Sequence, residues 1–110
     1  MENCIFCKIA SHEIPTNAEW ENEDAIAFHD IHPKAPVHIL IIPKKHIEKP
    51  WELSSAELSI MLNAAKEISR KLDVQETGFR LLFNVGVHAG QEINHVHLHL
   101  IGGAPSTAMY

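Results

Sequence analysis

The hydrophobic pattern of the chain alternates most clearly near its C-terminal end. Over residues 95–101 a histidine and an aliphatic residue follow each other in turn. Successive side chains of a β-strand point to opposite faces, so His95, His97 and His99 are predicted to share one face of a strand. Two glycines follow and are predicted to end this strand. The alternative is a half-buried strand whose outer face is polar by chance.

The middle of the chain has a helical period instead. Ser54 and Glu57 have the spacing of a capping box, in which each side chain accepts a hydrogen bond from the other residue's backbone N–H. Apolar residues then recur every three or four positions, at Leu58, Met61, Leu62, Ala65, Ile68 and Leu72. This pattern predicts a helix of about five turns with one apolar stripe. We interpret the stripe as a packing surface rather than a binding groove.

The remaining pattern predicts a short helix and further strands. The helix is expected within residues 4–11, ended by Pro15. Further strands are expected at 18–23, 25–30, 37–43 and 79–84. A loop over 85–94 separates the last of these from the histidine strand. The order predicts an α+β fold, a five-stranded antiparallel sheet with one long helix, in a single domain over residues 1–110.

Composition narrows the function classes. The chain has 110 residues and a net charge of −5, which disfavours binding to a nucleic-acid backbone. Charged residues interrupt the start of the chain, so no secretory signal is predicted. The aliphatic run Ile39–Ile42 is too short to cross a bilayer. We expect a soluble cytoplasmic protein without nucleic-acid or membrane partners, whose nine histidines are its unusual feature.

The two cysteines, Cys4 and Cys7, lie three residues apart. In a helical turn both thiols would lie on one side. They are compatible with a redox pair, half of a zinc site, or two small packing residues. A zinc site would need two histidines from elsewhere in the chain, and a redox pair would lack its usual preceding strand.

The loop over 85–94 contains Gly86 and Gly90 and leads directly into the histidines. Backbone N–H groups of such a loop can bind an anion. A neutral imidazole is a good nucleophile for phosphorus when its other nitrogen is protonated and held, for example by a backbone carbonyl. This pattern indicates phosphoryl chemistry that needs no metal. The alternative, a His-x-His metal pair, stays open, although three residues along a straight strand converge poorly on one ion.

The segment from Gly90 to Ile101 resembles the signature of the histidine triad (HIT) superfamily, and within it the HINT branch. Upstream segments over 5–9, 13–15, 27–31 and 35–46 resemble the same family in order and spacing. The resemblance implies the HIT fold and a homodimer whose two protomers join their sheets. It also implies that the protein binds purine nucleoside monophosphates and forms a nucleotidyl-histidine intermediate.

The same resemblance implies a role for individual residues. His97 would be the nucleophile, His99 would lie beside the phosphate, and His38 would be hydrogen-bonded near the triad. Asp30 would hold the ribose hydroxyls. The base would be enclosed by Phe6, Ile9, Phe28, His29 and Ile31. The phosphate loop would comprise Asn84 and the backbone of Gly90 and Gln91, and Glu92 would contact the nucleotide near the leaving group. No cofactor is implied for catalysis, but a structural zinc would be held by Cys4, Cys7, His46 and His95.

The activity that the resemblance favours is hydrolysis of a purine nucleoside 5′-phosphoramidate to the monophosphate and an amine. The alternatives are a dinucleoside polyphosphate hydrolase and a nucleotide-binding scaffold with vestigial catalysis. The chain departs from the family pattern in two places. Glu92 stands where many HINT-branch proteins have a serine near the leaving group, and the tail after Gly103 is short and ends in Tyr110.

Overall fold

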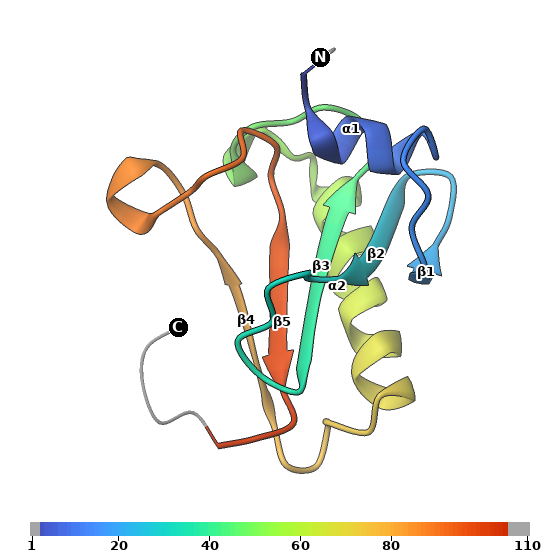
Figure 1. The fold of residues 1–110 in the computed structure, drawn as a ribbon, viewed down its shortest axis with the longest axis vertical. Helices are drawn as coiled ribbons and strands as arrows, with labels where there is room; N and C mark the ends of the chain where they lie inside the picture. Colours follow the sequence, from blue (N-terminus) through green and yellow to red (C-terminus); the bar gives the residue numbers. More distant parts are fainter. Residues whose placement is uncertain (1–2, 106–110) are drawn as a thin grey trace.

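The computed structural model describes residues 3–105 and confirms the predicted α+β class. Its elements follow the expected order (Figure 1), namely α1 (Ile5–Ala10), β1 (Ala18–Glu21), β2 (Ala25–His29), β3 (Val37–Pro43), the 3₁₀ turn η1 (Pro50–Glu52), α2 (Ser55–Lys71), β4 (Phe79–Phe83), the 3₁₀ turn η2 (Val87–Ala89) and β5 (Leu98–Gly102). Tyr110, the end of the short tail noted in the sequence, lies outside the described residues. No helix in this described range is long and apolar enough to span a bilayer.

The strands form one antiparallel sheet in the order β1-β2-β3-β5-β4. β5, the last strand in the sequence, lies between β3 and β4 (Figure 1). Its residue His99 pairs with Leu40 of β3 on one side and with Leu82 of β4 on the other. The last histidine of the triad is therefore held by hydrogen-bonded strands on both sides.

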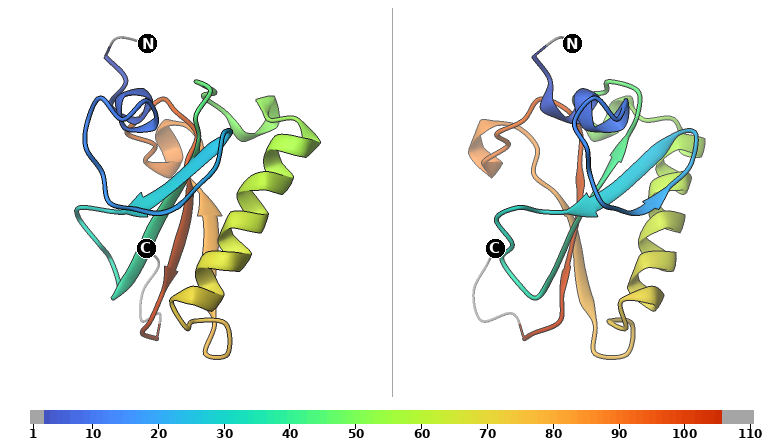
Figure 2. Two further views of the ribbon diagram at one scale, coloured as in Figure 1. Left: turned by 90° about the vertical axis from the view of Figure 1, so that its right-hand side faces the viewer. Right: turned by 45° about the vertical axis from the view of Figure 1, so that its right-hand side comes forward.

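The two helices cover opposite faces of the sheet (Figure 2). The side chains of Ile39 and Ile41 pack against α2, and those of Leu40 and Ile42 pack in the cluster that contains Phe6 of α1. β3 is apolar on both faces because both are covered, as its sequence predicts. Since His99 lies opposite Leu40, its side chain belongs to the α1 face.

The structure corrects the extent of the histidine strand. β5 begins at Leu98, so His95 and His97 precede the strand and only His99 lies within it, although the His97 ring is still next to that of His99, with centroids 5.0 Å apart. The physical reason is a different hydrogen-bond partner, because the Val96 N–H donates to the Ile47 carbonyl rather than to the β3 ladder. Gly102 is the final residue of the strand rather than the residue that stops it.

The long helix begins as predicted, but its buried face is turned slightly. The Ser54 hydroxyl accepts from the Glu57 N–H at 3.0 Å, and the Glu57 carboxylate accepts from the Ser54 N–H at 2.7 Å. Leu62 is 45% exposed, whereas Ala64 and Ser69 are buried. Leu62 follows the buried Met61 directly, and a helix turns about 100° per residue, so the two cannot face the same way.

The short helix ends earlier than Pro15. α1 stops at Ala10, and the Ser11 N–H donates to the Cys7 carbonyl at 3.0 Å. His12 follows with a φ of 65°, a left-handed conformation that stops a helix. The end of α1 is therefore set by its own last turn.

Candidate active site and metal centre

His38 and His99 form a hydrogen-bonded pair on the α1 face of the sheet. They come from neighbouring strands, and His38 Nε2 lies 3.0 Å from His99 Nδ1. The backbone N–H of Lys34 donates to His38 Nδ1 at 3.0 Å. Because a backbone N–H can only donate, His38 carries its proton on Nε2 and donates it to His99. Neutral His99 must then carry its own proton on Nε2.

Burial keeps both rings of this pair neutral. It lowers the pKa of His99 to about 4, and the nearby rings of His97 and His38 act in the same direction. Burial also lowers the pKa of His38, while the carboxylate of Asp30 opposes that shift. Asn84 Nδ2 lies 3.4 Å from His99 Nε2, and since an NH₂ group can only donate, the proton on Nε2 requires the Asn84 side chain to turn its Oδ1 toward the ring. His99 therefore offers one N–H as a donor at neutral pH.

His97 has the opposite arrangement of proton and lone pair. Its Nδ1 lies 2.8 Å from the backbone carbonyl of His95, which can only accept, so the proton is on Nδ1. This is the kind of backbone carbonyl that the sequence argument required. Nε2 is left with a free lone pair. The ring lies 5.0 Å from that of His99, centroid to centroid, so a nucleophilic nitrogen and a donor N–H are neighbours.

Asp30 lies against the same pair. Its Oδ1 accepts from the His32 N–H at 2.9 Å, and its Oδ2 lies 3.4 Å from His38 Nε2. Asp30, His38 and His99 each have an atom able to bind a metal ion, and these three atoms lie within 4.8 Å of one another. A metal ion does not fit there, because the Lys34 N–H occupies His38 Nδ1 and so keeps the His38 proton on Nε2, the nitrogen that would have to bind the ion.

A second cluster joins the two cysteines to two histidines. Cys4 Sγ lies 3.3 Å from His95 Nδ1, and Cys7 Sγ lies 3.2 Å from His46 Nδ1. All four ligand atoms lie within 4.8 Å of one another. His95 Nε2 is 2.8 Å from the Pro43 carbonyl, so Nε2 carries the proton and Nδ1 faces the thiols with its lone pair.

This second cluster fits a tetrahedral zinc ion. Typical zinc–sulfur and zinc–nitrogen bonds place the two ligand atoms roughly 3.5 Å apart, close to the separations found here. A histidine whose other N–H is held by a backbone carbonyl is the usual form of a metal-binding histidine. Without a cation, burial raises the pKa of the Cys7 thiol to about 11. Convergence of two imidazoles on the thiols favours the metal alternative over a redox pair or plain packing.

Residue His95 connects the two clusters. Its buried side chain faces the thiols, and its backbone carbonyl holds Nδ1 of His97. The Phe6 ring packs in a T-shaped arrangement against both imidazoles, with its centroid 5.8 Å from that of His95 and 5.1 Å from that of His97. Fixing the His95 ring would therefore also fix the carbonyl that sets the proton position on His97.

The expected base-binding residues are divided between core and surface. Phe6, Ile9 and Phe28 are buried in the core cluster on the α1 face. Ile31 is 84% exposed, and His29 is exposed with its Nε2 3.0 Å from Glu19 Oε2.

The expected phosphate loop is partly occupied by its own contacts. The Gly90 N–H donates to the Val87 carbonyl, and the Gln91 N–H donates to the Gly86 carbonyl. Both N–H groups are therefore engaged within the loop in this structure. Glu92 is exposed at the end of the loop.

Two contributors to the site had no signal in the sequence. The Lys34 backbone N–H sets the proton positions of the His38–His99 pair, and a backbone donor leaves no trace in residue identity. Lys49 contacts the side chain of Gln91 across 42 positions of sequence, and only a known fold could have paired them.

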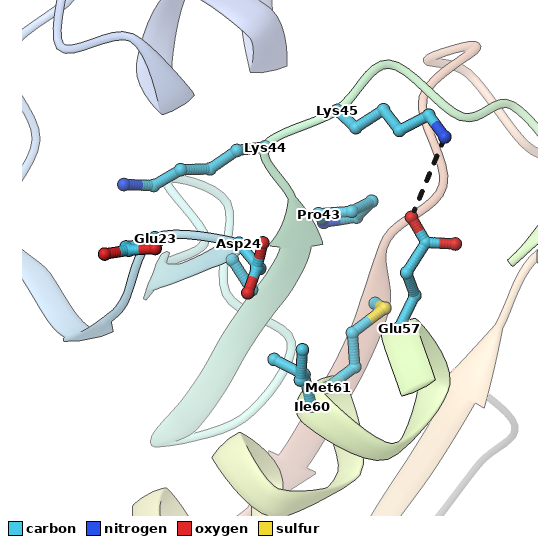
Figure 3. Close-up of a pocket in the computed structure, with 9 residues that line it drawn as sticks. Glu23, Asp24, Pro43, Lys44, Lys45, Glu57, Ile60 and Met61 are labelled. Atoms are coloured by element: carbon cyan, nitrogen blue, oxygen red, sulfur yellow. Dashed lines mark ion pairs between the residues drawn. The ribbon is translucent and has the colours of Figure 1, made fainter. Parts of the chain in front are cut away.

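A separate hollow lies between α2 and the place where β2 begins and β3 ends (Figure 3). It is lined by charged and apolar side chains, and both of its lysines form ion pairs. Lys45 lies 4.0 Å from Glu57, and Lys44 lies 2.6 Å from Glu21. None of the triad histidines lines this hollow, so we assign no chemistry to it.

Comparison with known proteins agrees with this geometry. The profile of the HIT domain matches residues 11–106. Purine nucleoside phosphoramidase of Escherichia coli (strain K12) is 40% identical over 107 residues, covering 94% of this chain and 90% of that protein. A crystal structure of a HIT family hydrolase from Legionella pneumophila has a TM-score of 0.91 at 46% identity, covering 96% of each chain. A histidine triad protein from Clostridium difficile has a TM-score of 0.91 at 35% identity, covering 100% of this chain and 98% of that one. The chain therefore belongs to the HIT domain family.

Proposed function

We propose that the protein hydrolyses purine nucleoside 5′-phosphoramidates to the nucleoside monophosphate and an amine. The observation that carries the proposal is the hydrogen bond from His97 Nδ1 to the His95 carbonyl, which leaves Nε2 as a free nucleophile. The similarity to a protein named purine nucleoside phosphoramidase supports the choice of substrate.

The reaction would have two steps. His97 Nε2 attacks phosphorus, the phosphorus–nitrogen bond breaks, and the amine leaves with a proton from solvent. Water then attacks the nucleotidyl-histidine, releases the monophosphate, and restores the lone pair of Nε2. His99 donates its Nε2–H to a phosphoryl oxygen, and the His95 carbonyl stabilises the positive charge on the substituted ring.

The test is turnover of adenosine 5′-phosphoramidate by wild type and by His97→Ala, followed as AMP release. Loss of the nucleophile should reduce turnover by several orders of magnitude. His32→Ala is the control, because the His32 side chain is exposed and lies outside the triad. A His97→Ala rate above about a tenth of wild type would contradict the nucleophile assignment.

Diadenosine polyphosphates belong in the same assay, because the same nucleophile could attack a phosphoanhydride. Faster turnover of these anhydrides than of the phosphoramidate would favour the dinucleoside polyphosphate alternative. Nucleotide binding without turnover of either substrate would favour a scaffold with vestigial catalysis.

We propose further that Cys4, Cys7, His46 and His95 hold a structural zinc ion. When bound, the ion would join α1 to the segment that precedes β5 and fix the His95 ring. Catalysis would use none of its coordination positions, because four protein ligands already complete a tetrahedron. Elemental analysis of protein purified without chelator should find about one zinc per chain. Freely titratable thiols in metal-free protein of unchanged thermal stability would contradict this site.

We also propose a homodimer in which two copies of β4 pair across the interface. β4 is an edge strand of the sheet, and Leu81 at its centre is 38% exposed. An edge strand presents unpaired backbone groups that another strand can satisfy. Light scattering should find a dimer for wild type and a shift toward monomer for Leu81→Lys, because a charge on the edge opposes pairing. A monomeric wild type would contradict the proposal.

A further inference from the structure

The half-buried side chain of Gln91 makes all of its hydrogen bonds to other groups of the protein. Its Oε1 accepts from the Gly86 backbone N–H at 2.9 Å and from Lys49 Nζ at 2.9 Å. Its Nε2 donates to the Ile93 carbonyl at 3.1 Å and to the Glu48 carbonyl at 3.3 Å. A primary amide has two N–H donors and two acceptor lone pairs. The side chain therefore has no donor or acceptor left for a ligand.

These side-chain contacts add to the backbone hydrogen bonds inside the loop and connect the loop to a segment that is remote in the sequence. The loop over 85–94 lies outside the sheet, at the end of β4 (Figure 1). Its backbone has a φ of 78° at both Gly86 and Gly90, and glycine loses more conformational entropy than other residues when it is fixed in one conformation. Gln91 fixes one side of the loop at Gly86 and the other at Ile93, and connects both to the segment at 48–49.

We propose that Gln91 is a positioning residue that holds the loop over 85–94 in the shape that receives the phosphate of the nucleotide, with Lys49 as its second support. We call Gln91 and its four partners, Gly86, Glu48, Lys49 and Ile93, the Gln91 clasp. The inference rests on the proposed function for the identity of the ligand. It assigns the Gln91 side chain to shaping the site rather than to touching the nucleotide.

Loss of the clasp should weaken binding of the phosphate group and leave binding of the nucleoside unchanged. The loop connects Asn84, whose amide lies beside His99, to the segment that carries His97. A misplacement of about 1 Å in such a segment can cost about 100-fold in rate. Asp30, the residue expected at the ribose, is held by His32 and His38 and not by this loop.

The informative variants are Gln91→Ala, which removes the whole clasp, and Lys49→Met, which removes one contact and keeps the aliphatic stem. Gln75→Ala is the matched control. Gln75 also donates from Nε2 inside the protein, to the Lys66 carbonyl at 3.1 Å and to Ser69 Oγ at 2.9 Å. It follows the end of α2 and makes no contact with the loop over 85–94 among these hydrogen bonds.

Two measurements decide the inference. Amide hydrogen exchange without nucleotide should show lost protection over 86–93 in Gln91→Ala, a smaller loss in Lys49→Met, and none in Gln75→Ala. Calorimetry should show AMP affinity reduced at least about tenfold in Gln91→Ala, or about 1.4 kcal/mol. Adenosine affinity should be unchanged. The ratio of AMP to adenosine affinity is the readout that a general loss of stability would not move.

Unchanged loop protection in Gln91→Ala would overturn the inference, and so would an equal loss of AMP and adenosine affinity. A wild type that binds no AMP would instead refute the proposed function. The hydrogen-exchange comparison uses no nucleotide, so it would still decide whether the clasp orders the loop.

Discussion

The neutral His38–His99 pair makes stability depend on pH in a predictable direction. The pKa of His99 in the folded protein is lowered from 6.5 to about 4. At a pH between these two values, His99 is mostly protonated in the unfolded chain and mostly neutral in the folded one. The contribution of neutral His99 to the free energy of unfolding is therefore fully present above the unfolded pKa, and it is lost as the pH falls from that value toward the folded pKa. Protonation would also place a second N–H opposite the one that His38 donates.

The magnitude follows from the two pKa values. Between about pH 7.5 and about pH 5, His99 alone should remove about 2 kcal/mol of the free energy of unfolding. His38 and His95, whose pKa values are also lowered by burial, add to the loss in wild type. The contribution of His99 is therefore measured as a difference between wild type and a His99→Gln variant. Gln is chosen because its amide oxygen can still accept the Nε2–H of His38, which keeps the surroundings of His38 similar in the two proteins.

Urea unfolding at the two pH values gives the free energies directly. His99→Gln should be less stable than wild type at the higher pH, but it should lose about 2 kcal/mol less on acidification. His32→Gln is the control, since His32 is exposed and outside the hydrogen-bonded pair. If His99→Gln and wild type lose equal stability on acidification, His99 is not held neutral by its surroundings and the assigned proton positions are wrong.

Three further predictions concern single residues. If Asp30 accepts hydrogen bonds from the ribose hydroxyls, deoxy-AMP should bind more weakly than AMP by roughly 1–3 kcal/mol, and equal affinities in calorimetry would remove Asp30 from the site. If Glu92 faces the leaving amine, wild type should turn over phosphoramidates of cationic amines faster than those of neutral amines, and Glu92→Ser should abolish this preference; an unchanged ratio of kcat/KM would contradict it. Ser54→Ala should lower the free energy of unfolding by about 1 kcal/mol in urea titrations through loss of the N-cap, and no change would contradict the capping role.

Local patterns predicted most of the fold. The bounds of β3 and the start of α2 were predicted because a continuous apolar run and a capping box are patterns of neighbouring residues. The bounds of β5 were not, because the partner of the Val96 N–H is the carbonyl of Ile47, which is remote in the sequence. The exposed Leu62 shows the same limit, since apolar spacing alone cannot tell which of two adjacent positions faces the sheet.

The candidate site was predictable at the level of residue types and only partly at the level of contacts. The resemblance named both histidine clusters, and the structure brings each of them together. A backbone carbonyl behind the nucleophile was expected, and the His95 carbonyl fills that role for His97. The proton positions on His38, His99 and His95 could not be predicted, because they depend on the Lys34 N–H and on the Pro43 carbonyl. Main-chain groups are the same at every position, so no sequence pattern can report which one meets an imidazole.

The place of β5 in the sheet has a consequence for how the protein acquires activity. β5 comes after every other strand in the chain, yet it fills the position between β3 and β4. The His38–His99 contact joins residues 61 positions apart, and such long-range pairing is slow to form because loop closure must come first. During synthesis the emerging chain can assemble β1, β2 and β3 with α2, but β4 has no neighbour until β5 arrives. Nucleophile, donor and thiol cluster should therefore appear together in one late folding step, so that an incomplete chain carries no partial chemistry.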